Sequence, residues 1–72
     1  MKVSYKKLWK LLIDKNLKKT DLKTLAHISS GSLAKLGKDE NVSMDILQRI
    51  CLALKCDISD IVEMVPDSEE NI

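Results

Sequence analysis

Residues 20–36 read TDLKTLAHISSGSLAKL, and this stretch decides the fold. Its apolar residues recur at intervals of three and four, which is the spacing of a helix face that packs against a core. The pattern is interrupted once, at residues 27–29. It therefore predicts two short helices, at 20–26 and at about 30–36, joined by three residues in the manner of a helix-turn-helix.

Residues with capping chemistry mark the ends of this helix pair. Thr20 is a good N-cap for the first helix, and Asp21 adds a negative charge at its positive end. Ser29 is expected to cap the second helix, and Gly37 supplies its stop signal. The apolar residues expected to face the core are Leu22, Leu25, Ala26, Ile28, Leu33 and Leu36.

Three further helices are expected around the pair. The first is capped by Ser4 and ends where Asn16 adopts the left-handed conformation. Its apolar stripe is Tyr5, Leu8, Trp9, Leu12 and Ile13. After a polar loop at 38–42, Ser43 caps a helix with the stripe Leu47, Ile50, Cys51 and Leu54.

A short fifth helix is expected to begin near Asp57. Asp57 can cap it, and Asp60, three positions on, completes a capping box. Its core contacts would be Ile58, Ile61, Val62 and Met64. Pro66 ends the helix, and the sequence contains neither an internal repeat nor a strand-like alternation.

Charge is distributed unevenly, although the formal net charge is only +1. Residues 1–38 hold ten lysines against two acids, which gives +8, and residues 39–72 hold two cations against nine acids, which gives −7. Such asymmetry indicates a surface in the first half that binds a polyanion. The alternative is that these lysines only solvate helix surfaces.

Size and composition argue against several classes of protein. Seventy-two residues are near the lower limit for a self-supporting core, which leaves little room for a catalytic cleft. No apolar stretch approaches the roughly twenty residues of a membrane span, and the start has no signal-peptide core, so a cytoplasmic protein with no membrane contact is expected.

The residues with reactive side chains form no recognisable catalytic or metal site. Cys51 and Cys56 lie too close in sequence to staple distant segments, and with His27 as the single histidine they do not complete a zinc site. We expect reduced core cysteines and a structural His27. No catalytic residue, metal, cofactor or small-molecule substrate is expected, and the protein is not expected to be an enzyme.

The chain resembles the Cro and phage-repressor type of helix-turn-helix regulators, also called the XRE family, over residues 4–65. Beyond the helix pair, the resemblance rests on KDENVSMDILQRICLAL at 38–54 and CDISDIVEM at 56–64. It implies an all-α, compact five-helix DNA-binding domain over residues 1–66. The acidic residues 67–72 are then expected to form a flexible tail.

Two residues depart from the family pattern. Glycine is usual at the turn position that His27 occupies, where the backbone often needs a positive φ that strains a side chain. A small residue is common where Lys23 stands. Lys23 is therefore expected either to loosen the contact between the two motif helices or to lean outward toward DNA.

The resemblance implies that the second motif helix lies nearest to the bases. The residues in question are Ser30, Gly31, Ser32 and Lys35. Lys35 is the strongest candidate for reading a guanine edge, whereas the short residues allow close backbone approach and readout of DNA shape.

Phosphate contacts are expected on either side of that helix. The candidates are Lys18, Lys19, Thr20, Lys23, Lys38 and Asn41. Lys6, Lys7 and Lys10 are instead interpreted as solvated charges, and Trp9 as a core residue.

These expectations combine into a sequence-specific DNA-binding transcriptional regulator, a repressor, that inserts the helix at about 30–36 into the major groove of double-stranded DNA. One recognition helix buries little surface, so a homodimer on a two-fold repeated site is expected. The resemblance implies a bacterial or mobile-element setting. The alternative is a protein-interaction module, such as an antitoxin or a regulatory partner subunit.

Overall fold

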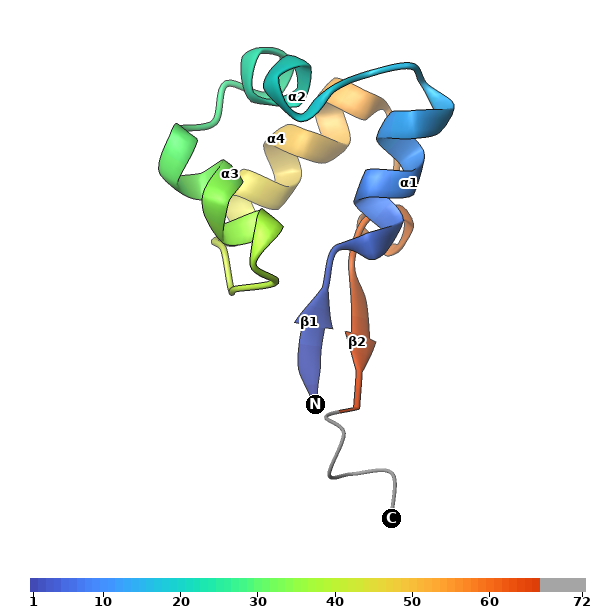
Figure 1. Ribbon diagram of the computed structural model, residues 1–72, viewed down its shortest axis with the longest axis vertical. Coiled ribbons are helices and arrows are strands. Elements are labelled where there is room, and N and C mark those ends of the chain that lie inside the picture. The colour runs from blue at the N-terminus through green and yellow to red at the C-terminus, as the bar shows by residue number, and fades with distance from the viewer. Residues whose placement is uncertain (67–72) are drawn as a thin grey trace.

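The computed structural model describes residues 1–66, which form four helices and a small two-stranded sheet (Figure 1). In chain order the elements are β1 (Lys2–Ser4), α1 (Lys6–Asp14), α2 (Lys19–Ala26), α3 (Ser30–Gly37), α4 (Met44–Leu54), the 3-10 turn η1 (Ile58–Asp60) and β2 (Glu63–Val65). The predicted helical class is confirmed. The predicted count of five helices is wrong, because the last one is only the turn η1, and the predicted tail at 67–72 lies outside the described residues.

The sheet is the element that the sequence pattern did not predict. Its strands run antiparallel with the partners Lys2–Val65, Val3–Met64 and Ser4–Glu63. Each strand has three residues, which is too short to reveal a two-residue alternation. Met64, expected in the core, lies in β2 and is 56% exposed.

Two helices begin at residues other than those expected. Tyr5 is the N-cap of α1, and Ser4 is the buried last residue of β1, although its Oγ still accepts a hydrogen bond from the Lys6 N–H at 3.3 Å. Lys18 is the N-cap of α2, so Thr20 lies inside the first turn. Asp21 closes that helix end by accepting the Lys18 N–H at 2.8 Å.

The other predicted caps are confirmed. Ser29 Oγ accepts the Ser32 N–H at 3.1 Å, and Ser43 Oγ accepts the Ile46 N–H at 3.3 Å. Asp57 caps η1 by accepting the Ser59 N–H at 3.1 Å. In the predicted capping box, Asp60 Oδ2 also accepts the Asp57 N–H at 2.9 Å.

The core lies where α2 packs on α4 and where η1 contacts α1 and α4. Its buried apolar residues are Tyr5, Leu8, Leu12, Leu22, Ala26, Ile28, Leu36, Leu47, Ile50, Leu54 and Ile61. Leu33, Trp9 and Cys51 are half-buried against this cluster. Ile13 and Leu25 were expected inside but are 73% and 48% exposed, because each lies at the margin of an apolar stripe that is wider than the buried face.

Tyr5 ties the start of α1 to the loop that follows α3. Its backbone N–H donates to Asp39 Oδ1 at 3.0 Å, and its buried hydroxyl donates to the Glu40 carbonyl at 2.7 Å. Burial raises the pKa of this hydroxyl above its ordinary value. The two hydrogen bonds fix the loop into which α3 runs.

The backbone turns through the left-handed region at residues other than glycine. The described residues with positive φ are Asn16, His27, Asp39 and Lys55. Asn16 confirms its expected role, and His27, with φ 55° and ψ 46°, confirms that the turn after α2 needs a positive φ. Gly37 was expected to supply the stop signal of α3, but its φ is not positive. The residue after α3 that adopts the left-handed conformation is Asp39.

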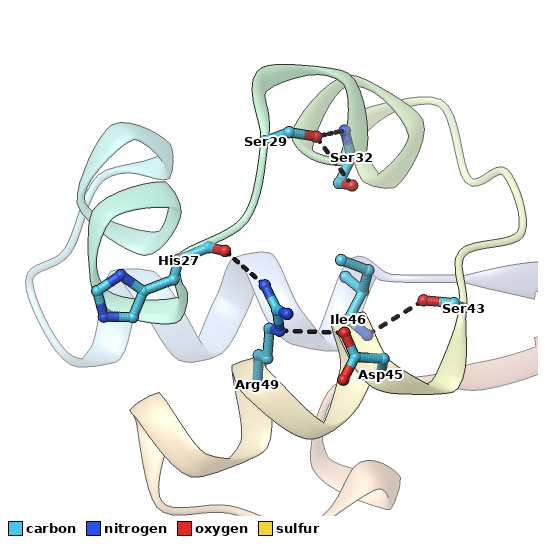
Figure 2. A network of polar contacts seen from close by, with 7 residues as sticks. All are labelled: His27, Ser29, Ser32, Ser43, Asp45, Ile46 and Arg49. Atoms are coloured by element: carbon cyan, nitrogen blue, oxygen red, sulfur yellow. Dashed lines mark hydrogen bonds and ion pairs between the residues drawn. The ribbon is translucent and has the colours of Figure 1, made fainter.

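Arg49 on α4 contacts the turn between α2 and α3 (Figure 2). Its Nη1 donates to the carbonyl oxygen of His27 at 2.9 Å, and its Nε pairs with Asp45 Oδ2 at 3.1 Å. Asp45 lies one helical turn earlier on α4, and it orients the guanidinium toward the turn. The turn is thereby joined to the helix that supports it.

Replacing the Tyr5 hydroxyl is expected to destabilise the fold. Tyr5→Phe leaves the Glu40 carbonyl without its donor, so the free energy of unfolding should fall by about 1 kcal/mol. Urea unfolding followed by circular dichroism measures this loss. Thr24→Val removes an exposed hydroxyl that bonds only within α2 and is the control. Equal losses in the two variants would contradict a special role for Tyr5.

Glycine at the turn is expected to stabilise the fold. His27→Gly removes the left-handed strain of a side chain, and the net gain should be about 0.5–1 kcal/mol after the entropy cost of glycine. The hydrogen bond from Arg49 is kept, because its acceptor is the backbone carbonyl. Thermal unfolding measures the gain, and His27→Ala, which retains the strained Cβ, should not show it. A gain of the same size in both variants would refute this explanation.

Candidate nucleic-acid interface

Two serines shape the first turn of α3. Ser29 Oγ accepts the Ser32 N–H at 3.1 Å and donates to Ser32 Oγ at 3.2 Å (Figure 2). Ser32 is half-buried, and the hydrogen bond from Ser29 holds its hydroxyl toward the cap. Of the four residues expected nearest to the bases, Ser32 is therefore the one that the structure turns away from the open face.

The other three expected residues lie on the exposed side of α3. Ser30, Gly31 and Lys35 are all exposed, and Leu36 on the opposite side is fully buried. Gly31 and Lys35 are four residues apart and share one face of the helix. The helix carries a lysine and no acidic residue, so this face has a positive charge.

The exposed face of α3 also contains a residue that the sequence reasoning missed. Ala34 is exposed and lies three residues after Gly31 and one before Lys35. Its methyl group is of the kind that packs against a thymine methyl in the major groove. The helical spacing could have identified it, because residues i, i+3 and i+4 lie on one face.

The start of α2 gathers a second set of expected residues. Lys18, Lys19 and Thr20 are all exposed there, and the first N–H groups of any helix lack partners within the helix. The Nζ of Lys19 lies 4.5 Å from the ring centroid of Trp9. Trp9 is half-buried rather than a fully enclosed core residue, and its ring restrains the ammonium group.

Two of the three remaining expected phosphate contacts lie apart from this set. Lys23 is half-buried in α2, and Lys38 and Asn41 are exposed in the loop after α3. In Figure 1 that loop is at the lower end of α3, whereas α2 lies at the top of the molecule. The residues at the start of α2 and those in the loop after α3 therefore do not form one cluster.

The lysines of α1 differ among themselves. Lys6, Lys7 and Lys10 are all exposed, in keeping with their interpretation as solvated charges. Lys7 also donates from Nζ to the Ser59 carbonyl at 2.6 Å, which links α1 to η1. Its ammonium group thus has a structural contact that the sequence did not indicate.

The two cysteines are free thiols, Cys51 within α4 and Cys56 just after it. Burial raises the pKa of both, and that of Cys56 reaches about 11. Thiols of this kind are poor nucleophiles at neutral pH. Within residues 1–66, no three potential metal-ligating side chains come together. In the same part of the chain, no helix is long and apolar enough to cross a membrane.

The arrangement matches proteins whose family and structure are known. The family model of the Cro/C1-type helix-turn-helix DNA-binding domain matches residues 7–67. The crystal structure of the transcriptional regulator VanUg, Form II, is similar with a TM-score of 0.89 and 52% sequence identity, over 92% of this chain and 88% of that one. No curated protein matches the chain.

A family match that includes α2, α3, α4 and all but the first residue of α1, together with this agreement in backbone, identifies the fold beyond the motif alone. The chain belongs to the family of Cro/C1-type helix-turn-helix DNA-binding domains.

Proposed function

We propose that the protein is a DNA-binding transcriptional regulator that inserts α3 into the major groove of double-stranded DNA. The observation that carries this proposal is the exposed, acid-free face of α3, opposite the side that Leu36 anchors in the core. A major groove about 12 Å wide admits such a helix. In this proposal Ser30, Gly31 and Lys35 lie against the bases, and Ser32 supports the first turn.

The flanking lysines, together with Thr20 and Asn41, would hold the DNA backbone. Lys18, Lys19 and Thr20 would grip one phosphate group at the start of α2, where the helix dipole assists. Lys23, Lys38 and Asn41 would contact the backbone nearer to α3. Roughly five phosphates neutralised in each subunit would make the affinity strongly salt-dependent.

A homodimer acting as a repressor completes the proposal. Helix α3 has eight residues and is about 12 Å long, so it covers only a few base pairs. Two subunits on half-sites one DNA turn apart would supply the surface that tight binding needs. In this proposal the dimer occupies a promoter and so blocks transcription without any chemical step. The protein would act in the cytoplasm, where bacterial DNA lies.

Selecting bound sequences from a random duplex pool tests this function. We expect an inverted repeat, and binding that weakens steeply as salt rises. On the selected site, Lys35→Ala should relax the preference at one base position by about 1–3 kcal/mol. Lys19→Ala should weaken all sequences alike and reduce the salt slope by about 1.

The matched control for both variants is Lys6→Ala, which removes an exposed lysine from α1 and should leave binding unchanged. Fluorescence anisotropy with labelled duplexes gives the dissociation constants. Equal effects of the Lys35 and Lys19 variants on every sequence would refute the assigned roles. The absence of any salt-sensitive binding would instead favour the protein-interaction module.

A further inference from the structure

Gly31 has no role in the fold that requires glycine. Its φ is not positive, so the backbone there suits any residue. A Cβ added at this position would meet only Ser29 Oγ, at an ordinary contact distance of 3.7 Å. Alanine would therefore fit within the chain itself.

The glycine nevertheless weakens the helix that contains it. Glycine is a poorer helix former than alanine, because its backbone loses more conformational freedom on folding. An eight-residue helix has little stability of its own to lose. Within residues 1–66, no contact and no backbone conformation requires that position 31 be a glycine.

Gly31 points directly away from the core. At 100° per residue, the buried Leu36 lies about 140° around the helix from Gly31, whereas Lys35 lies about 40° away. Gly31 also belongs to the first turn, the part of a recognition helix that comes closest to the base edges. With α3 in the major groove, a side chain at position 31 would lie between the helix backbone and the base-pair edges.

We propose that Gly31 is a specificity-determining residue whose missing side chain lets the first turn of α3 approach the base-pair edges of the operator. This inference rests on the proposed function, since it needs α3 in the major groove. Close approach brings the short side chains of Ser30 and Ala34 within reach of the bases. Clearance thus compensates for the lack of Arg, Gln and Asn on this helix, whose single long polar side chain is Lys35.

Two glycine-to-alanine variants test the proposal in the full chain. In Gly31→Ala we expect the melting temperature to rise by about 1–5 °C, because alanine favours the helix. Its dissociation constant for the selected operator should rise by at least about tenfold, because the new Cβ prevents close approach. Its affinity for an unrelated duplex should stay the same, since nonspecific complexes depend on phosphate contacts.

Gly37→Ala is the matched control. Gly37 is also a helical glycine with open space around it, and it lies about 9 Å further along the axis of α3. The same substitution there should raise the melting temperature without changing the affinity for the operator. Opposite changes of stability and operator affinity, confined to position 31, would support the clearance role.

Three results would overturn the inference. The first is unchanged operator binding by Gly31→Ala, or a loss as large on the unrelated duplex. The second is an equal loss in Gly37→Ala, which would reflect a general property of the helix. The third is a lower melting temperature of Gly31→Ala, which would show that the fold itself needs the glycine. If the unmodified protein binds no duplex at all, the proposed function fails, and the inference fails with it.

Discussion

The position of α3 depends on the buried packing of α2 on α4 and of α3 on α2. An eight-residue helix is unstable by itself in water, so α3 exists because Leu36 and Leu33 attach it to a surface that is already formed. Leu22 and Ile50, which have no exposed surface, form that support from two other helices. The inward face of α3 consequently tolerates little change, and its outward face remains free to carry specificity.

Polar contacts restrain α3 at both ends. At its start, the Arg49 guanidinium contacts the carbonyl of the preceding turn, and at its end Tyr5 bonds to the loop that follows. Lys19 is restrained in a similar way by the ring of Trp9. Groups that are ordered before DNA arrives lose less entropy on binding. In the proposed function, this preorganisation contributes to affinity beside the charge of the lysines.

The sequence predicted the features that depend on a helical period of apolar residues or on hydrogen bonds between neighbouring residues. It missed the features that depend on contacts between distant segments. The period of the apolar residues indicated α1 to α4, and the caps at Ser29 and Ser43 were correct because each depends on neighbours three residues away. The strands were missed because three residues carry no period and pair only when distant segments meet. The exposure of Ile13 and Leu25 depends on which part of an apolar stripe has a partner. The residues on the exposed face of α3 could be named from the motif, but their individual roles depend on a ligand that the sequence does not encode.

The pairing of Lys2 with Val65 brings the two ends of the described chain together at one edge. In Figure 1 this ladder projects below the helices, away from α2. Chain ends that lie side by side at a surface suit circular permutation and the insertion of a domain into another protein. A host chain that entered at residue 2 and left at residue 65 would therefore do so at a single place on the surface, away from the helices.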